Sequence, residues 1–361
     1  MKLVLTGGGT GGHIYPALSV AAALPDAELL FVGAAERIEA RVVPAAGHPF
    51  RAIRCAPVER RGGLGAVRAL GVNLLGVIDA LRILREVRPA AVIGTGGFAA
   101  AGVMTAAVLL RLPLVMIAPD PVLGRVNGML RRWSAAIACG SEETVARVGP
   151  RGVFTGVPIR PGFDRGDAGA ARNALDLRAD LPTLLVLGGS GGARRINETV
   201  VAALPELIAL GVQVVHQSGA ALHAETRAAV GEAPAGYRLV PFIEQMADAL
   251  AAADLVLCRG GASTIAEVTA AGKPAIVVPY PYAVTDEQTK NAERLARHGA
   301  GELLREAELT PARLAQVLRV WLADADRLTR AAAASRALGR PDAAAEVADL
   351  VRRIAASRRS D

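Results

Sequence analysis

Near its start the chain reads Leu3-Val4-Leu5-Thr6-Gly7-Gly8-Gly9-Thr10-Gly11-Gly12-His13-Ile14-Tyr15-Pro16. This pattern predicts a short apolar strand, a glycine-rich turn and a helix that starts near Pro16. Glycines allow positive φ angles and close approach of a ligand, and a helix start presents free N–H groups and a positive dipole end. The stretch therefore predicts a loop around a negatively charged group, with the titratable side chain of His13 at its exit. Gly7, Gly9 and Gly12 also fit the dinucleotide fingerprint G-x-G-x-x-G, which is a weak signal alone.

The same succession of strand, glycines and helix recurs along the chain. Residues 90–93 predict a strand, Gly94-Thr95-Gly96-Gly97 a loop, and a helix follows from Phe98. This division argues against a membrane span in the uncharged run 89–110. In the second half, Gly188-Gly189-Ser190-Gly191-Gly192 also follows an apolar strand. Neither this loop nor the first ends in the Gly-Lys-Ser/Thr of a P-loop, which argues against nucleoside-triphosphate hydrolysis.

Apolar, strand-like runs alternate with alanine-rich helical stretches over the whole chain. The runs span residues 2–5, 29–32, 90–93, 114–117, 135–139, 183–187, 212–216, 255–258 and 275–278. Fully apolar strands between helices indicate parallel sheets that are covered on both faces. We therefore expect an α/β fold of two doubly wound, Rossmann-like domains that face a central cleft.

A cluster of helix- and strand-breaking residues indicates where the two domains divide. Two prolines and two glycines interrupt the pattern in Gly156-Val157-Pro158-Ile159-Arg160-Pro161-Gly162. We expect an N-terminal domain over residues 1–159 and a C-terminal domain over 160–340. A last helix over 341–357 follows Gly339-Arg340-Pro341 and is expected to cross back to the N-terminal domain.

Composition indicates the class of protein. The 361 residues are 52% hydrophobic and 21% charged, which is typical of a soluble globular protein with a large core. Cys55, Cys139 and Cys258 are widely spaced and odd in number, so they predict neither a disulfide framework nor a zinc site. The few apolar residues before the first glycines are too short for a signal peptide. These observations fit a reducing cytoplasm.

Positive charge is concentrated in the N-terminal half. Residues 1–160 hold 18 Lys and Arg against 10 Asp and Glu, whereas the rest of the chain holds 23 against 24. Basic surfaces favour partners that carry phosphate. Six Phe, four Tyr and two Trp offer few platforms for base stacking, and no nucleic-acid motif is present. We therefore expect an anionic membrane surface, and no nucleic acid, as a partner.

Residues 64–87 predict a long helix with apolar side chains at helical spacing. These side chains are Val67, Leu70, Leu74, Ile78, Leu81 and Leu84, and we interpret them as buried core. Val72, Leu75 and Ile83 lie off this stripe, near Arg68, Arg82, Arg85 and Arg88. Such a surface suits either peripheral docking on anionic lipid or simple exposure to solvent.

Six motifs stand in a recognisable order and spacing. They are Gly8-Gly9-Thr10-Gly11-Gly12-His13 with Pro16, Gly94-Thr95-Gly96-Gly97-Phe98, Gly188-Gly189-Ser190, His216-Gln217-Ser218-Gly219, Cys258-Arg259 with Glu267, and residues 286–291. The set resembles the MurG family of bacterial N-acetylglucosaminyltransferases, within the GT-B superfamily. The resemblance implies transfer of GlcNAc from UDP-GlcNAc to the C4 hydroxyl of the MurNAc of lipid I, with inversion, to form lipid II in peptidoglycan synthesis. It also implies a peripheral enzyme at the cytoplasmic face of the bacterial inner membrane, whose N-terminal domain holds the acceptor and faces the lipid.

The resemblance places the donor mainly in the C-terminal domain. The backbone of Ile243 would meet uracil, and Glu267 would meet the ribose. Ser190 and the helix start Ala262-Ser263-Thr264 would bind the diphosphate, while Glu287 and Gln288 would contact the GlcNAc hydroxyls. The donor-binding residues from the other side of the expected cleft would be Thr10, Gly11, Gly12, Asp120 and Arg160.

The acceptor and the catalytic base would come from the N-terminal domain. The resemblance implies acceptor contacts at Gly9, Thr95, Gly96 and Gly97, with His13 as the base. Helix starts can stabilise a leaving diphosphate without a metal, so we expect no metal and no cofactor. Asp324-Ala325-Asp326 superficially resembles a metal-binding Asp-x-Asp, but we interpret it as a solvated part of a late charged helix.

One segment departs from the family pattern. Where the family usually has His-Glu-Gln-Asn, this chain has Ile117-Ala118-Pro119-Asp120. A carboxylate accepts hydrogen bonds from sugar hydroxyls but cannot donate as an amide does. Changed donor preference, weaker activity or a neutral local substitution could follow. In the serine loop, Gly191 also stands where a glutamine is common.

Other classes of function fit parts of the sequence. A related GT-B enzyme with another UDP-sugar or lipid acceptor would keep most of the motifs. An NAD-dependent oxidoreductase would use the glycine fingerprint with Glu28 or Glu36 as the ribose-binding acid. A non-catalytic UDP-sugar-binding protein would keep the C-terminal motifs and tolerate the loss of His13.

Overall fold

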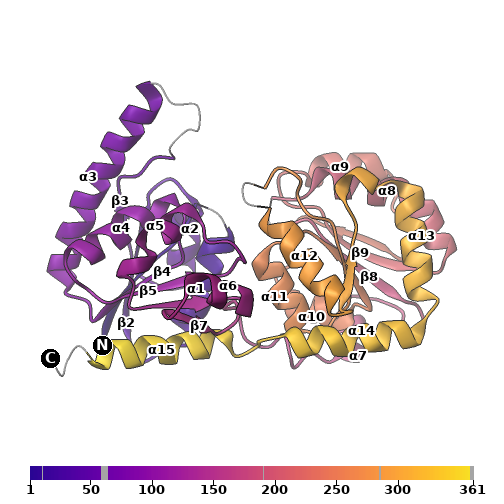
Figure 1. The fold of residues 1–361 in the computed structure, drawn as a ribbon. Coiled ribbons are helices and arrows are strands. Elements are labelled where there is room, and N and C mark those ends of the chain that lie inside the picture. The colour runs from indigo at the N-terminus through magenta and orange to yellow at the C-terminus, as the bar shows by residue number, and fades with distance from the viewer. Residues whose placement is uncertain (10, 58–63, 190, 284–285, 358–361) are drawn as a thin grey trace. The chain divides into compact units, whose positions relative to one another are not determined.

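A computed structural model describes the chain from residue 1 to 357, except for residues 10, 58–63, 190 and 284–285. The described chain folds into two compact units (Figure 1). The first unit combines Met1–Arg160 with the returning segment that begins at Asp342, and the second comprises Pro161–Pro341.

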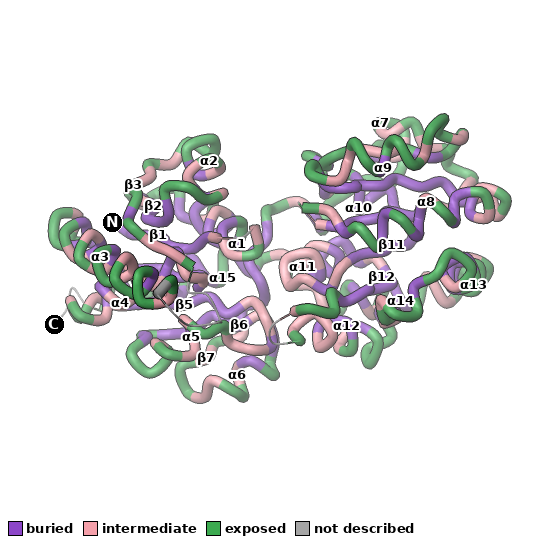
Figure 2. The backbone as a smooth tube through the Cα atoms, turned by 90° about the horizontal axis from the view of Figure 1, so that it is seen from above, coloured by how far each residue is buried: buried purple, intermediate pink, exposed green. Residues whose placement is uncertain are grey.

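The first unit is built on a parallel sheet of seven strands in the order β3-β2-β1-β4-β5-β6-β7. The central strands are fully apolar, and Figure 2 shows them buried beneath helices. In register, Leu3 of β1 lies beside Leu29 of β2 and Ala91 of β4. The strands are β1 (Lys2–Thr6), β2 (Glu28–Ala34), β3 (Phe50–Ile53), β4 (Ala91–Gly94), β5 (Leu114–Ala118), β6 (Ala136–Cys139) and β7 (Gly152–Phe154).

Helices cover both faces of this sheet because successive strand residues point to opposite sides. Leu3 and Leu5 pack with α1, α2 and α15, whereas Val4 packs with α3 and α4. Arg352 of α15 donates to the carbonyl of Ala23 at 3.2 Å and pairs with Asp26 at 2.9 Å. The helices are α1 (Gly11–Ala22), α2 (Ile38–Ala45), α3 (Leu64–Val87), α4 (Phe98–Leu109), α5 (Arg125–Leu130), η1 (Arg131–Trp133), α6 (Glu142–Val148) and α15 (Ala343–Ser357).

The second unit repeats this plan with six parallel strands in the order β10-β9-β8-β11-β12-β13. Its strands are β8 (Thr183–Leu187), β9 (Gln213–Gln217), β10 (Tyr237–Val240), β11 (Leu255–Cys258), β12 (Ala275–Val277) and β13 (Gly301–Leu303). Its helices are α7 (Ala168–Ala174), α8 (Arg194–Ala209), α9 (His223–Val230), α10 (Met246–Ala252), α11 (Ala262–Ala270), α12 (Glu287–Arg297), η2 (Glu306–Glu308), α13 (Pro311–Leu322) and α14 (Ala325–Leu338).

Strand order determines where each unit can bind a ligand. The order reverses between β1 and β4 in the first sheet, and between β8 and β11 in the second. Loops that leave two such neighbouring strands turn to opposite faces and leave a crevice at the carboxyl edge. The three glycine loops predicted from the sequence follow β1, β4 and β8, and Gly260-Gly261 follows β11.

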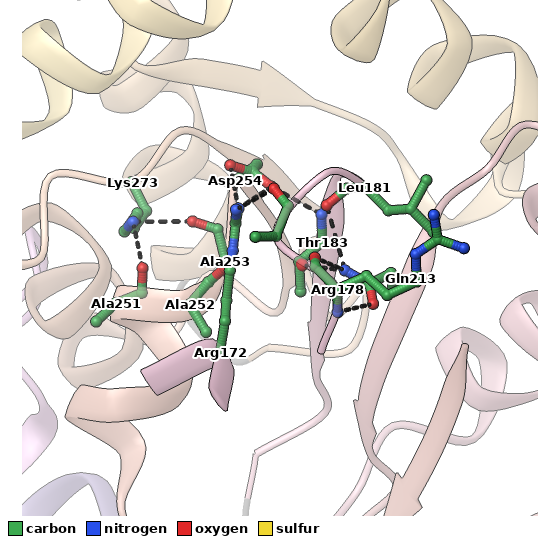
Figure 3. Close-up of polar contacts among 11 residues, drawn as sticks. Arg172, Arg178, Leu181, Thr183, Gln213, Ala251, Ala252, Ala253, Asp254 and Lys273 are labelled. Carbon is green, nitrogen blue, oxygen red and sulfur yellow. Dashed lines mark hydrogen bonds and ion pairs between the residues drawn. The ribbon is translucent and has the colours of Figure 1, made fainter. Parts of the chain in front are cut away.

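A half-buried ion pair and several backbone caps close the opposite edge of the second sheet (Figure 3). Asp254 pairs with Arg172 at 2.7 Å and accepts a hydrogen bond from the Thr183 backbone at 2.7 Å. Lys273 donates to the carbonyls of Ala251 and Ala253, and burial lowers the pKa of its ammonium group. This cluster joins the starts of β8 and β11 to α7 and α10, so it supports the fold rather than the carboxyl edge.

The predicted burial of the α3 stripe is wrong for the first half of the helix. Val67, Leu70 and Leu74 are 69%, 68% and 64% exposed, whereas Leu84 is buried. Ile83, which was expected off this stripe, is buried as well. The cause is the length of α3. This helix packs on α4 from about Gly76 onward, and the first turns of α3 extend past the sheet (Figure 1). The other expected stripe members differ too, since Ile78 is exposed and Leu81 is half-buried.

None of the described helices combines the length and the apolar character needed to cross a bilayer.

Candidate functional site

The first glycine loop connects β1 to α1 and is tied to α2. Gly9 has a positive φ of 86°, and its N–H donates to the Glu39 carboxylate at 3.0 Å. The helix begins at Gly11, not near Pro16 as predicted, because a proline in the second turn removes only one helical hydrogen bond. Gly11 and Gly12 therefore form the start of α1, while the predicted donor residue Thr10 lies outside the described residues.

His13 lies in the first turn of α1 and is half-buried. A side chain at Gly97 would come within 3.2 Å of the ring carbon Cδ2, so the second loop packs directly on the imidazole. Its Nδ1 is buried and has no hydrogen-bond partner among the described residues. Burial lowers the pKa of His13, while the Thr95 backbone and the charge of Glu39 act to raise it. A neutral imidazole that can accept a proton follows from this balance.

The second loop, after β4, meets the first. Gly97 has a φ of 81°, and a Cβ atom there would approach the Gly8 carbonyl to 2.5 Å. The structure therefore brings Gly9, Gly97 and His13 together, with Gly96 next to them. The side chain of Thr95 is fully buried beneath Gly7, so this residue can present only its backbone to a ligand.

Glu39 is a functional candidate that the sequence did not indicate. Its side chain is fully buried in the first turn of α2. Besides the bond from Gly9, its Oε1 accepts a hydrogen bond from the Ala34 N–H at 3.2 Å. A Cβ atom at Gly8 would collide with the same carboxylate. In the sequence, Glu39 is indistinguishable from any acidic residue that interacts with the dipole of its own helix.

The segment that departs from the family pattern lies at the carboxyl end of β5. Ile117 and Ala118 are buried in the strand, and Asp120 is half-buried just beyond it. The carbonyl of Asp120 accepts a hydrogen bond from the Thr144 hydroxyl at 3.2 Å. Arg160 is exposed at the last position of the first unit's main segment.

In the second unit, a cavity of about 510 Å³ lies between the two glycine loops. Its lining includes Gly188, Gly189, Thr264 and Gln288, which join the loop after β8 to the starts of α11 and α12. The predicted residue Ser190 in this loop lies outside the described residues. The remaining lining residues are Gly192, Ala193, Arg194, Arg195, Glu198, Arg259, Gly261, Tyr280 and Glu306.

The start of α11 presents polar groups at this edge. Ala262, Ser263 and Thr264 form its first turn after Gly261. The Ser263 hydroxyl is buried without a hydrogen-bond partner among the described residues, which is uncommon for a polar group. Glu267 is half-buried one turn further along, and it does not line the cavity.

The start of α12 is held against the loop after β11. The Oε1 of Gln288 accepts from the Tyr280 N–H at 3.0 Å, and Asn291 donates to the Gly260 carbonyl at 2.9 Å. Glu287, the first residue of α12, is half-buried. Gln288 is thus fixed at the cavity, with its amide NH₂ group as the end that could donate to a hydroxyl.

Ile243 is buried, and its backbone is already engaged. Its N–H donates to the Oε1 of Gln217 at 2.9 Å, and the Nε2 of the same glutamine donates to the Gly189 carbonyl at 3.2 Å. The sequence contains Gln217 in a recognised motif but gives it no role. Its partners lie 28 and 26 residues away in the chain, so only the fold reveals the bridge.

Charged and titratable groups nearby are mostly paired. Arg259 pairs with Glu306 at 2.5 Å and donates to two backbone carbonyls, and Arg194 pairs with Glu225. His216 is fully buried between the Tyr237 hydroxyl and Asn197 and has its pKa lowered to about 4 by desolvation. His216 is therefore a neutral structural residue.

Metal ligands are not grouped in the described part of the chain. No cluster of three or more His, Cys, Asp or Glu side chains there could hold an ion. Asp324 of the Asp-x-Asp sequence instead caps α14, because its carboxylate accepts from the Arg327 N–H at 2.7 Å.

Comparisons with known proteins cover nearly the whole chain. The glycosyltransferase family 28 N-terminal domain matches residues 3–139, and the family 28 C-terminal domain matches residues 183–350. The UDP-N-acetylglucosamine–N-acetylmuramyl-(pentapeptide) pyrophosphoryl-undecaprenol N-acetylglucosamine transferase of Alkalilimnicola ehrlichii is 43% identical over 96% of this chain and 97% of its own. The protein of the same name from Symbiobacterium thermophilum is 40% identical over 96% and 95%.

Solved structures agree with these matches. The crystal structure of Acinetobacter baumannii MurG is 30% identical, with a TM-score of 0.77 over 98% of this chain and 99% of its own. The glycosyltransferase of kitacinnamycin has a TM-score of 0.72 over 98% of both chains at 18% identity, and so shares the fold.

Proposed function

The chain belongs to glycosyltransferase family 28 and has the GT-B fold, and we propose that it is an inverting N-acetylglucosaminyltransferase of peptidoglycan synthesis. It moves GlcNAc from UDP-GlcNAc to the C4 hydroxyl of the MurNAc of lipid I and so forms lipid II. The observation that carries this proposal is the full-length match to relatives named for the transfer of N-acetylglucosamine to a lipid-linked N-acetylmuramyl-pentapeptide. The same match leaves the oxidoreductase alternative without support.

The donor binds mainly to the second unit. The cavity between the β8 and β11 loops supports this, because its lining combines backbone N–H groups with the start of α11, a favourable place for a diphosphate. Ser190, Ala262, Ser263 and Thr264 hold the diphosphate, and the unpartnered Ser263 hydroxyl finds its partner there. Ile243 meets the uracil, Glu267 the ribose, and Glu287 and Gln288 the sugar hydroxyls. Thr10, Gly11, Gly12, Asp120 and Arg160 complete the donor contacts.

The acceptor and the catalytic base belong to the first unit. Gly9, Thr95, Gly96 and Gly97 form the acceptor loops around His13. The neutral imidazole takes the proton of the C4 hydroxyl, and the hydroxyl oxygen forms a bond to C1 of GlcNAc. The bond from C1 to the diphosphate oxygen breaks, and its electron pair leaves with UDP. Helix starts stabilise that charge, so the reaction needs no cofactor.

Transfer of radiolabelled sugar to a short-chain lipid I analogue tests this proposal. We expect GlcNAc transfer from UDP-GlcNAc, and a loss of roughly 10²- to 10⁴-fold in kcat for His13→Ala. UDP-GalNAc and UDP-glucose run in parallel, because Asp120 replaces the family's asparagine and a related enzyme with another UDP-sugar is the second candidate. Transfer from no donor, despite measurable UDP binding, would contradict the assignment.

The first unit also carries the proposed membrane face, at the cytoplasmic side of the inner membrane. Its exposed apolar residues include Val67, Leu70 and Leu74 on α3, and Trp133 at η1. Exposed Arg68 lies on α3 beside these side chains in the sequence, and α5 and η1 carry further exposed arginines in the same unit. Apolar side chains and arginines in one unit suit peripheral docking on anionic lipid.

A further inference from the structure

Glu39 is a buried carboxylate whose position the fold maintains at a cost. Its side chain has 0% exposure, and no lysine or arginine among the described residues forms an ion pair with it. Instead, its two oxygens accept the N–H groups of Gly9 and Ala34, at 3.0 and 3.2 Å. Burying a charge without a counter-ion is unfavourable unless hydrogen bonds compensate it. Gln or an apolar residue would be cheaper to bury, so the charge itself calls for an explanation.

The two bonds locate the carboxylate between two segments of the site. Ala34 ends β2, and Gly9 lies in the loop that follows the neighbouring strand β1. Gly8 also packs on the carboxylate, so closely that no larger residue fits there. Glu39 therefore fixes the main chain of residues 8 and 9 immediately before the turn of α1 that carries His13.

We propose that Glu39 is a positioning residue of the transfer reaction, which anchors the first glycine loop and keeps a negative charge near the first turn of α1 when the imidazole of His13 takes the acceptor proton. This inference rests on the proposed function. Proton transfer turns a neutral ring into an imidazolium in a half-buried site, where desolvation opposes the new charge. The carboxylate offsets part of that penalty without touching the reacting atoms.

The electrostatics of the surrounding groups agree with this role. Burial is the largest influence on His13 and lowers its pKa, while the charge of Glu39 acts in the opposite direction. Cys55 is another titratable group near the carboxylate, and burial, together with Glu39, raises the pKa of its thiol. Arg37 is exposed, lies over the Phe98 ring at 5.3 Å and weakly opposes Glu39 at Cys55.

Three variants test separately the charge of Glu39, the length of its side chain and its position in the chain. Glu39→Gln keeps the size but loses the charge, and its NH₂ group faces one of the two backbone donors. Glu39→Asp keeps the charge but cannot reach both donors. Glu36→Gln, at an exposed position three residues earlier, is the matched control. The assay is GlcNAc transfer to the lipid I analogue as a function of pH, with thermal unfolding of each variant alongside.

His13 acts as a base only when neutral, so kcat rises as the pH rises through its pKa. Loss of the neighbouring negative charge disfavours imidazolium and lowers that pKa. For Glu39→Gln we therefore expect the acidic limb of the profile to move to lower pH by roughly half a unit to one unit. We also expect its plateau to fall by about tenfold, because the base is weaker. Glu39→Asp should have a lower kcat than the parent, while the acidic limb of its pH profile stays at the same pH. Glu36→Gln should match the parent in both kcat and pH profile.

An NMR titration of the His13 ring, assigned by comparison with His13→Ala, gives the same pKa without turnover. If the parent transfers no GlcNAc, the proposed function fails, while the His13 titration in Glu39→Gln still decides the present inference. An unchanged His13 pKa in Glu39→Gln would overturn it. If Glu39→Gln does not fold, Glu39→Asp tests the inference instead. A kcat of Glu39→Asp equal to that of the parent would show that anchoring of the first glycine loop by Glu39 is not needed.

Discussion

At the scale of single residues, Gln217 joins two segments that the proposed donor site requires. It is the last residue of β9 and is buried. One end of its amide donates to the Gly189 carbonyl, and the other accepts from the Ile243 N–H. This bridge connects the loop proposed to hold the diphosphate to the segment proposed to meet the base. Because the N–H of Ile243 is engaged, its carbonyl is the group left for the proposed contact with uracil.

We expect Gln217→Leu to raise the Kd for UDP by about tenfold, measured by isothermal titration calorimetry. The substitution leaves a buried carbonyl and a buried N–H unpaired, and such groups cost about 1–3 kcal/mol each. The control is Gln213→Leu, at the first position of the same strand, where the amide bonds Arg178, Leu181 and Thr183 (Figure 3). That variant should lose stability but keep its UDP affinity. Equal Kd values for the parent and Gln217→Leu would refute the bridge.

Residues next to a glycine loop were predictable, whereas their distant partners were not. The glycine loops that lead to His13 and contain Gly97 follow apolar strands directly, so the place of these residues at a carboxyl edge could be deduced from the chain. Glu39 is 30 residues from Gly9, and Gln217 is 28 from Gly189. Their roles depend on which strands lie side by side, which periodicity does not specify. The exact start of α1 was also missed, because Pro16 looked like a first helical residue and lies in the second turn.

At the scale of elements, two glycines in α3 have opposite surroundings. A Cβ atom at Gly76 would collide with the Arg54 carbonyl, and Gly102 of α4 packs on the Gly76 backbone. Nothing lies near a Cβ atom at Gly71, one and a half turns earlier. Gly76 thus marks the point where α3 closes onto its unit, and the turns before it project outward.

Gly76→Ala should destabilise the protein by roughly 1–3 kcal/mol, because the added methyl group forces the backbones of α3 and β3 apart. Gly71→Ala is the matched control, and we expect it to be neutral or stabilising by roughly 0.5–1 kcal/mol, since alanine is the better helix former. Chemical denaturation followed by circular dichroism measures both. Equal stability of the two variants would mean that the helix can shift away from Arg54 without loss.

The strands show what apolar patterning can and cannot reveal. The nine predicted strands all correspond to interior strands of the two sheets, with ends within a few residues of those observed. The four that were missed, β3, β7, β10 and β13, are the edge strands. An edge strand is short and partly exposed, as the mixed burial of Gly152–Phe154 shows, so it leaves no continuous apolar run. The predicted burial of the apolar stripe of α3 was wrong for the converse reason. Helical periodicity shows that apolar side chains share one face of a helix, but not whether another element packs against that face.

At the scale of the whole molecule, the excess of positive charge and most of the exposed large apolar side chains belong to the same unit. Residues 1–160 carry eight more basic than acidic side chains, whereas the remainder is nearly neutral. The exposed residues of α3 and η1 lie in the same part of the chain. The proposed membrane docking requires both features in the unit proposed to hold the lipid-linked acceptor.

We expect the protein to co-sediment with phosphatidylglycerol vesicles at low salt and to remain in solution at high salt. Replacing Leu70 and Leu74 by serine should weaken binding by about tenfold or more, because each buried leucine contributes roughly 1.5–3 kcal/mol. The control is Val320→Ser, which alters an exposed apolar residue of the second unit. Sedimentation that is absent at every salt concentration, or unchanged in the leucine variant, would remove α3 from the membrane face.

The return of α15 has a consequence for how the chain is made. Val347 and Val351 complete the core around β1, although they are synthesised more than 300 residues after it. During translation the second unit, which is continuous from Pro161 to Pro341, emerges whole while the first still lacks one of its helices. The first unit, which is made first, is therefore completed only after α15 has been synthesised, and the apolar face that α15 covers stays open until then.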